Sequence, residues 1–295
     1  MPNYGNMGDI IIAQAEYQLF DKFNFQYKIF DETITENLVY GGGGIFVKNW
    51  CHCYQWLLEL FQKTELQKII ILPSSFYDCP DLLEIIDERF IIFCREQQSY
   101  DYLVQSNKKA KYYLENDMAF FLKSNFLKTR NTRRLDYRNV YDKLVLSLID
   151  LREVNGFKIA YFLRADSEKK VHQQDFDLLQ TIDLSNSINS DSSNKNDCNF
   201  YSKLFLAAID SADIIVTDRL HVGIGSMLLG KEVFLIDNSY GKVSEVYRYS
   251  MQNIARVHFI DDICFLSDEI NNRVKNEKIR ITANTKNLNR IGKFL

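Results

Sequence analysis

Short apolar runs rich in β-branched and aromatic residues alternate along this chain with longer amphipathic stretches. This alternation is typical of βαβ units and a parallel sheet rather than of a β-sandwich. The predicted strands are Leu38–Tyr40, Lys68–Leu72, Phe90–Cys94, Ala110–Leu114, Lys158–Leu163, Gln180–Leu184, Ile214–Thr217, Val233–Ile236 and Val257–Ile260. The predicted helices are Asp9–Phe23, Trp50–Gln62, Ser99–Ser106, Ser167–Leu179, Tyr201–Asp210, His221–Leu229 and Ser244–Met251. We therefore expect an α/β protein whose helices cover both faces of its sheets.

The pattern weakens around residues 123–155, where basic side chains cluster, and strand character resumes at Phe157. We interpret the weak stretch as a connector between two Rossmann-like domains that face each other across a cleft. Residues 185–200 are rich in Ser, Asn and Asp without apolar periodicity, so we expect an exposed, mobile loop there. The expected division is an N-terminal domain at 1–125, a connector at 126–156, a C-terminal domain at 157–270 and a basic tail at 271–295.

Composition and charge exclude several classes of protein. The 295 residues are 46% hydrophobic and 25% charged, which is ordinary for a globular chain. The net charge of −3 provides no overall positive field for binding nucleic acid. No apolar run is long enough to span a bilayer and the chain opens without a signal-peptide pattern, so we expect a cytoplasmic protein.

The tail at 271–295 carries seven Lys or Arg residues against Glu277 alone. Two interpretations stay open: a solvated helix end, and peripheral contact with the anionic inner face of a membrane. The six cysteines are too few and too irregularly spaced for a disulfide framework, so we expect them to be reduced. Cys51, His52 and Cys53 are adjacent and have no second pair nearby in sequence, which fits zinc sites poorly, and we assign no metal site.

Glycine is scarce, with 12 residues, and ten of these fall in two regions of the chain. In the first, Gly5 and Gly8 permit a tight turn around Asn6, and Asp9 is placed to cap the helix that follows. A helix N-terminus there could bind an anion, Asp9 could act as a base on a sugar hydroxyl, or the segment could simply be a capped helix start.

Four consecutive glycines, Gly41 to Gly44, directly follow the predicted strand that ends at Tyr40. The run is neither GxGxxG nor a P-loop, because no Lys-Ser/Thr follows it, so a conventional dinucleotide or ATP site is weakly supported. Missing side chains allow a ligand to approach the backbone closely. We therefore expect Gly42 and Gly43 to form part of a binding loop.

Two arginines end predicted strands, one in each half of the chain. Arg95 follows the strand Phe90–Cys94, and Arg164 follows the first strand of the second half. In open α/β sheets ligands bind outside the carboxyl ends of the strands. One such arginine is usually a surface salt-bridge partner, but two at equivalent positions favour anion binding.

The most informative segment is Thr217-Asp218-Arg219-Leu220-His221, where a buried strand passes into a glycine-containing helix. A lone histidine is usually structural, but His221 stands beside Arg219 at a strand-to-helix turn, which favours function. After the next strand, Tyr240-Gly241-Lys242 brings Lys242 to the same edge of the predicted sheet.

Taken together, NYGNMGD, the glycine run, CREQQS, TDRLH and YGK resemble motifs of the polysaccharide pyruvyl transferase family over nearly the whole chain. The resemblance implies a glycosyltransferase-B-like fold and transfer of pyruvate from phosphoenolpyruvate to a sugar as a cyclic ketal, without a further cofactor. The expected acceptor is a sugar or lipid-linked oligosaccharide of an exopolysaccharide or similar surface polysaccharide. Motif matching implies that the donor site contains Arg219, His221, Lys242 and Arg95.

We add Arg164 as a further donor cation, His221 as proton donor and Asp9 as the base for the acceptor hydroxyl. An imidazole exchanges protons near neutral pH, as this chemistry requires. Two other functions stay open. A nucleotide-sugar-dependent glycosyltransferase would share the fold, and a non-catalytic glycan-binding protein would use the aromatic side chains of the first half, such as Trp50, Tyr54 and Trp56.

Overall fold

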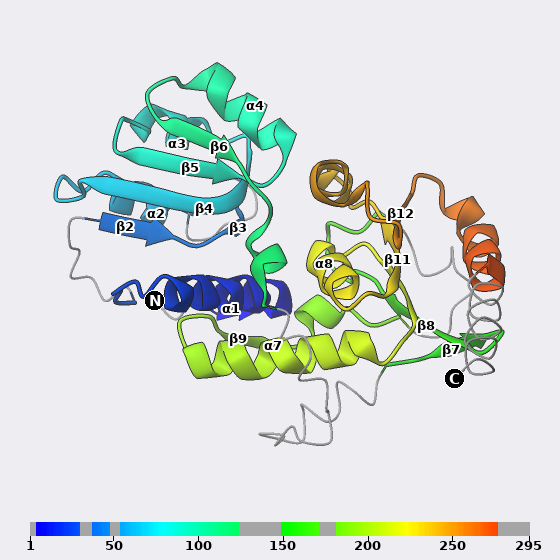
Figure 1. Cartoon of the computed structure of the whole chain (residues 1–295). Coiled ribbons are helices and arrows are strands. Elements are labelled where there is room, and N and C mark those ends of the chain that lie inside the picture. Colours follow the sequence, from blue (N-terminus) through cyan, green and yellow to red (C-terminus); the bar gives the residue numbers. More distant parts are fainter. Residues whose placement is uncertain (1–3, 30–36, 48–53, 124–148, 171–180, 277–295) are drawn as a thin grey trace, which may run out of the picture.

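A computed structural model describes residues 4–29, 37–47, 54–123, 149–170 and 181–276. These residues form a mixed α/β structure with two main sheets, each flanked by helices (Figure 1). The expected α/β class is therefore confirmed. Trp50 and the Cys51-His52-Cys53 segment lie outside the described residues, as do most of the predicted helix Ser167–Leu179 and most of the connector.

The first sheet is entirely parallel and has the strand order β2-β4-β5-β6, with β3 also paired to β4. Its central strand, β4, is buried along nearly its whole length, as expected of a strand covered on both faces. Phe46, Phe61, Phe76 and Phe90 fill its core. The elements are β2 (Asn37–Tyr40), β3 (Gly43–Val47), α2 (Tyr54–Phe61), β4 (Lys68–Tyr77), α3 (Pro80–Ile85), β5 (Phe90–Cys94), α4 (Gln97–Ser106) and β6 (Lys111–Leu114).

The second sheet has the order β12-β11-β10-β8-β7, in which only β7 runs antiparallel. A turn at Asn155-Gly156, where both residues have positive φ, joins β7 to β8 and starts this sheet before the expected boundary at residue 157. The elements are β7 (Arg152–Val154), β8 (Phe157–Phe162), α7 (Lys195–Asp210), β10 (Ile214–Thr217), α8 (Leu220–Leu228), β11 (Glu232–Ile236), α9 (Lys242–Val246), the π-helical turn η6 (Tyr247–Met251) and β12 (Val257–Ile260).

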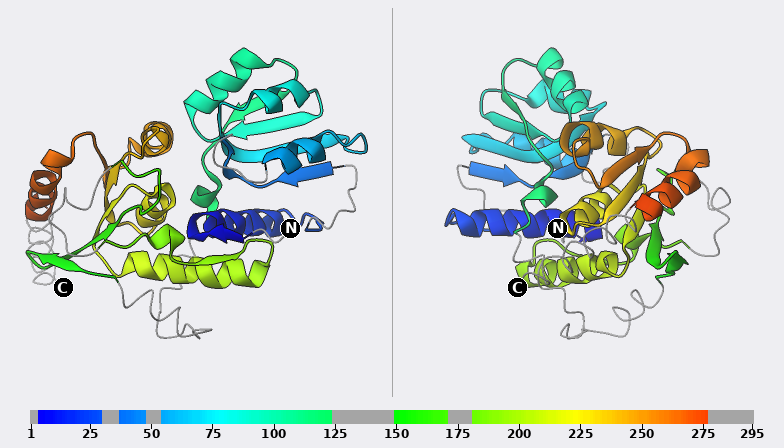
Figure 2. Two further views of the ribbon diagram at one scale, coloured as in Figure 1. Left: turned by 180° about the vertical axis from the view of Figure 1, so that it is seen from behind. Right: turned by 45° about the vertical axis from the view of Figure 1, so that its right-hand side comes forward.

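The N-terminal segment packs against the second half of the chain. Strand β1 (Tyr4–Asn6) pairs antiparallel with β9 (Asn189–Asp191), and helix α1 (Met7–Lys22) lies alongside α7 (Figures 1 and 2). Met7 and Ile11 of α1 share one core with Phe205 and Ile209 of α7. Helix α1 therefore lies between the first sheet and α7, with its N-terminus near α8.

Two sequence predictions about the second half are wrong. The described part of the predicted strand Gln180–Leu184 is irregular and leads into a 3₁₀ turn, η5 (Leu184–Asn186), capped by Asp183. The expected loop at 185–200 instead contains β9 and the start of α7. Asn194 in this stretch is a helix cap rather than a loop residue, since its side chain accepts the backbone N–H groups of Asn196 and Asp197 in α7.

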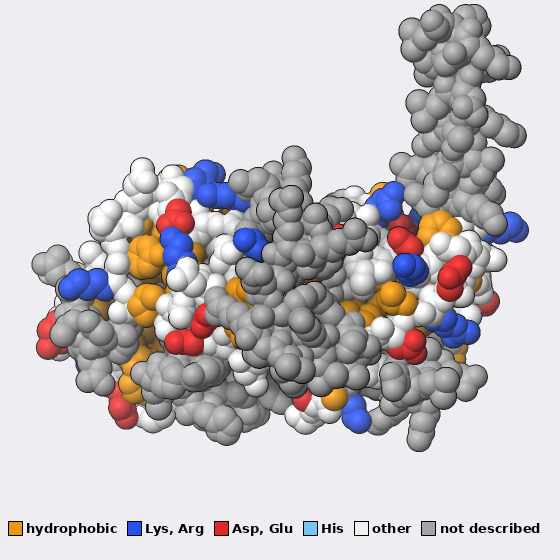
Figure 3. All heavy atoms as spheres, turned by 90° about the horizontal axis from the view of Figure 1, so that it is seen from below, with side chains coloured by type: hydrophobic (Ala, Val, Ile, Leu, Met, Phe, Trp, Pro, Cys, Tyr) orange, Lys and Arg blue, Asp and Glu red, His pale blue; other side chains and the backbone are white. Residues whose placement is uncertain are grey.

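Most predicted strands are confirmed within a residue or two, but β4 continues to Tyr77, and β1, β3, β7 and β9 were not predicted. Strand β3 begins inside the glycine run, and glycine is depleted in strands, although the last three residues of β3, Ile45, Phe46 and Val47, are apolar. Within the described part of the chain, no helix is both long and apolar enough to cross a membrane. Seen from below, the described surface carries acidic and basic side chains intermixed with scattered hydrophobic ones (Figure 3).

Candidate active site

The site is built first around the N-terminus of α1. Asn6 caps the helix by accepting the backbone N–H of Gly8 at 2.8 Å, and the Asp9 carboxylate accepts the N–H of Asn6 at 3.0 Å. This reciprocal pair is a capping box, and it leaves the exposed Asp9 with a structural task. Gly5 packs on Asp9, because a Cβ at Gly5 would lie 2.6 Å from Asp9 Cβ.

Gly8 brings the same helix end against His221. A Cβ on Gly8 would lie only 2.3 Å from His221 Nδ1, which is a severe overlap. His221 itself sits in the first turn of α8, two residues after Arg219, as the sequence predicts. Glycine at position 8 therefore allows two helices from opposite ends of the chain to meet at the imidazole.

The glycine run passes between α1 and the rest of the site. Glu16, on the same face of α1 as Gly8, accepts the backbone N–H of Gly42 at 2.7 Å. A Cβ on Gly42 would lie 2.7 Å from the Pro73 carbonyl oxygen, and Gly43 adopts φ of +129°, which side chains disfavour. Burial, together with the nearby Asp117 carboxylate and despite the bond from Gly42, raises the pKa of Glu16 to about 7.

Gly44 marks the point where two cations converge. A Cβ placed there would lie 2.9 Å from Lys242 Nζ and 3.3 Å from Arg95 Nη2, so these two nitrogens are at most about 6 Å apart. Arg95 comes from the carboxyl end of β5 in the first sheet and Lys242 from the start of α9 beside the second sheet. The two halves of the chain thus contribute one cation each to the same place.

Arg95 is completely buried and held by neighbouring side chains. Its Nε donates to Ser75 Oγ at 2.8 Å and its Nη1 donates to Asp117 Oδ2 at 2.7 Å. Glu96 accepts from Ser75 at 3.0 Å and contacts Ser99, which completes a buried polar chain behind the guanidinium. Arg95 Nη2 has no hydrogen-bond partner among the described residues, although it is buried. An unpaired buried donor of this kind is suited to an anionic ligand.

Asp117 joins Arg95 to His221. Its Oδ2, bonded to Arg95, also lies 3.4 Å from His221 Nε2. Burial alone would raise the pKa of Asp117, but His221 and Arg95 outweigh burial and hold it well below its usual range. Asp117 therefore stays ionised between Arg95 and His221.

Lys242 follows Gly241, whose φ of +83° places it in the left-handed region. Burial and the Arg95 charge lower the pKa of the Lys242 ammonium to about 8, partly opposed by Glu168. A bound anion would favour the charged form, so this amine is poised to respond to ligand binding.

Arg164 and Arg219 form a second cluster at the carboxyl ends of β8 and β10. They share Asp166, with Arg164 Nε at 2.9 Å and Arg219 Nη2 at 2.7 Å from its oxygens. Arg219 Nε also donates to Asp183 at 2.9 Å. Asp218 accepts the backbone N–H of Arg164 at 2.8 Å, and burial raises the pKa of the Asp218 carboxyl to about 6. Both arginines are thus anchored by carboxylates.

Three of the residues singled out from the sequence, Arg95, His221 and Lys242, thus come together. Arg164 and Asp9 both act electrostatically on Lys242, Arg164 from the neighbouring cluster and Asp9 from the capping box. Sequence reasoning missed Asp117 and Glu16. Asp117 stands in a short polar turn after β6, where nothing in the sequence marks it out. Glu16 is a carboxylate among the largely apolar residues of α1, which is a signal that the sequence did offer.

The family model of polysaccharide pyruvyl transferases matches residues 6–240, a range that contains all of these groups except Lys242. The chain belongs to the polysaccharide pyruvyl transferase family. This membership confirms the resemblance seen in the motifs and indicates a pyruvyl transferase of polysaccharide biosynthesis in general terms. No relative among curated proteins matches the chain.

This pyruvyl transferase family member is similar to a solved structure from Klebsiella pneumoniae subsp. pneumoniae NTUH-K2044, described as a functional uncharacterized protein, KP1_0663. The two sequences are 27% identical, and the structures superpose with a TM-score of 0.67. The similarity covers 89% of this chain and 91% of the other, so it concerns the whole arrangement of sheets rather than one half.

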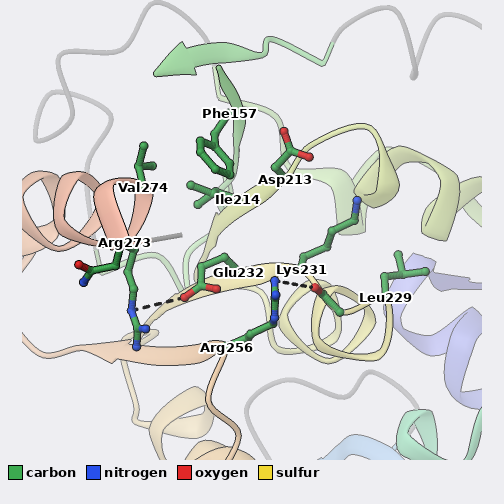
Figure 4. Close-up of a pocket in the computed structure, with 11 residues that line it drawn as sticks. Phe157, Asp213, Ile214, Leu229, Lys231, Glu232, Arg256, Arg273 and Val274 are labelled. Atoms are coloured by element: carbon green, nitrogen blue, oxygen red, sulfur yellow. Dashed lines mark hydrogen bonds and ion pairs between the residues drawn. The ribbon is translucent and has the colours of Figure 1, made fainter. Parts of the chain in front are cut away.

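A separate cavity of about 230 Å³ lies at the opposite edge of the second sheet, where β8, β10 and β11 begin (Figure 4). Its charged groups have partners within the protein: Lys231 pairs with Asp210 at 2.7 Å, and Glu232 lies 3.5 Å from Arg273. The candidate site is therefore the cluster at the carboxyl edge instead. No group of three or more possible metal ligands occurs in the part of the chain that the structure describes.

Proposed function

We propose that this protein transfers pyruvate from phosphoenolpyruvate onto a sugar of a bacterial-type surface polysaccharide or its precursor, forming a cyclic ketal. The observation that carries the proposal is the convergence of Arg95 Nη2 and Lys242 Nζ beside Gly44, with His221 connected to Arg95 through Asp117. Fixed cations next to a group that can deliver a proton are what an anionic enol donor requires.

The donor carries a phosphate and a carboxylate, and the site offers a matching distribution of charge. Arg95 contributes the unpaired Nη2, and Lys242 contributes an amine whose charge an anion would reinforce. We assign Arg164 and Arg219 to the far end of the same donor. Their carboxylate partners hold them in place, and a guanidinium has further N–H groups to offer a ligand.

In the proposed reaction, the methylene carbon of the donor gains one proton, and C2 of the donor loses its bond to phosphate and forms bonds to two sugar oxygens. His221 gives a proton to the methylene carbon of the donor, which becomes a methyl group. One sugar hydroxyl bonds to C2 and phosphate leaves with its bridging oxygen. A second hydroxyl then closes the ketal, and the two hydroxyl protons pass to phosphate and to a base. Asp9 is our candidate for that base, since its capping bond occupies only one carboxylate oxygen.

The fold completes the proposal. We propose that the two sheets and their helices form two Rossmann-like domains in a glycosyltransferase-B-like arrangement, with the acceptor bound on the side of the first sheet and the glycine run. In this proposal the reaction takes place in the cytoplasm, on a sugar or lipid-linked oligosaccharide, with the basic tail in peripheral contact with the membrane surface. The reaction needs no cofactor beyond the donor itself.

The proposal is tested by measuring phosphate release from phosphoenolpyruvate with a panel of bacterial glycan acceptors. We expect release that depends on the acceptor and disappears in His221→Gln. Thermal unfolding in the presence of each candidate donor supplies the control, because a ligand that binds the folded state raises the melting temperature. Stabilisation by nucleotide sugars but not by phosphoenolpyruvate would support a glycosyltransferase instead, and acceptor binding without any turnover would support a glycan-binding protein.

A further inference from the structure

The two ring nitrogens of His221 have different surroundings. Nε2 is buried, has no hydrogen-bond partner in the described structure and lies 3.4 Å from Asp117 Oδ2. Nδ1 faces the other way, toward the backbone of Gly8 at the start of α1. In a catalytic histidine, the hydrogen bond made by the ring nitrogen that does not face the substrate usually fixes which tautomer is present. The surroundings of Nε2 therefore decide what Nδ1 can do.

Hydrogen bonds at both carboxylate oxygens fix the position of the Asp117 side chain. Its Oδ1 accepts the backbone N–H of Ala119 at 2.9 Å, which caps the turn η2 (Met118–Phe121). Its Oδ2 accepts from Arg95 Nη1 at 2.7 Å, and the side chain is fully buried. One carboxylate is thus tied to the backbone and to the arginine, and it presents a fixed oxygen to the imidazole.

We propose that Asp117 is the positioning residue for His221: it keeps a proton on Nε2 and leaves Nδ1, beside Gly8, as the nitrogen that gives its proton to the substrate. This inference rests on the proposed function, in which His221 is the proton donor. When Nδ1 transfers its proton to the donor carbon, the imidazole becomes neutral and retains the Nε2 proton that faces Asp117. Asp117 itself neither gains nor loses a proton.

The charged groups around this pair come from several elements. Arg95 reaches Asp117 from β5, and Glu96 stands behind Arg95. Glu16 acts on Asp117 from α1, and Lys242 lies beside Arg95 from α9. Because Asp117 touches both Arg95 and His221, occupation of the arginine by a donor anion and protonation of the histidine are linked through one carboxylate.

Asp117→Asn is the discriminating variant because it keeps the side-chain size and an oxygen for the Ala119 cap, yet removes the charge. Removal of the carboxylate charge beside Nε2 should move the alkaline limb of kcat to lower pH. We also expect kcat at pH 8 to fall at least about tenfold, while the KM for phosphoenolpyruvate does not rise. If Asp117 had only a structural role, Asp117→Asn would lower kcat by the same factor at every pH.

A second measurement does not depend on turnover. In ¹⁵N spectra of the wild-type protein, with the His221 signals identified by their loss in His221→Gln, the neutral imidazole should carry its proton on Nε2. Asp117→Asn should mix the two tautomers, whereas Asp101→Asn, a change at an exposed residue of α4, should not. A wild-type imidazole protonated on Nδ1, or an unchanged tautomer in Asp117→Asn, would overturn the assignment even if the proposed activity is found. Absence of activity with the expected tautomers would instead count against the proposed function.

Discussion

Replacement of Glu16 by glutamine tests the electrostatics of the glycine loop. The pKa of Glu16 is raised from 4.5 to about 7, because the folded protein favours its protonated form. Its stabilising contribution is therefore complete below pH 4.5, falls as the pH rises and is lost above pH 7. Linkage gives a loss of about 2.5 kcal/mol between pH 5 and pH 8.5. Glu16→Gln keeps an oxygen to accept the Gly42 N–H and removes the titration.

Urea unfolding of the wild type and Glu16→Gln at pH 5 and at pH 8.5 measures this contribution. We expect the wild type to lose about 2.5 kcal/mol more unfolding free energy than the variant over this interval. Glu59→Gln, a change at an exposed residue of α2, is the matched control and should track the wild type. If Glu16→Gln and the wild type lose stability in parallel, the burial and charge argument for Glu16 is wrong.

Three further predictions concern the site. Gly8→Ala should lower kcat at least about tenfold, because the added methyl group would lie 2.3 Å from His221 Nδ1. Alanine favours a helix by about 1 kcal/mol over glycine, so the helix itself should be retained. Normal kinetics with an intact circular dichroism spectrum would refute the contact. Arg219→Lys should lower the unfolding free energy by about 1–3 kcal/mol and raise the donor KM, because a lysine cannot replace its several bonds to Asp166 and Asp183; unchanged denaturation and kinetics would contradict this. His221→Gln should abolish turnover at an unchanged melting temperature, and residual wild-type activity would remove it from catalysis.

The sequence predicted the regular parts of the fold well, for a simple physical reason. Buried parallel strands such as β10 are continuous apolar runs, and their boundaries are visible in a single sequence. The prediction of a loop at residues 185–200 was wrong because the polar residues that are typical of loops also cap helices, and no local signal separates the two roles.

The site was predictable only in so far as it depends on strand ends. Arg95, His221 and Lys242 follow buried strands, and parallel sheets bring such positions to one edge. The contact of Gly8 with His221 and the link through Asp117 depend on packing between distant segments. Likewise, the pairing of Arg219 with Asp183 joins a strand end to a turn that the sequence suggested was a strand.

The most direct test of the central claim is the structure of the product formed in D₂O. With phosphoenolpyruvate and a competent acceptor, we expect release of phosphate and a sugar whose mass grows by that of pyruvate less one water. The ketal methyl group should carry one solvent deuterium, because a proton from the enzyme must reach the donor carbon. A product that keeps the donor's methylene group, or a sugar transferred from a nucleotide donor instead, would contradict the account.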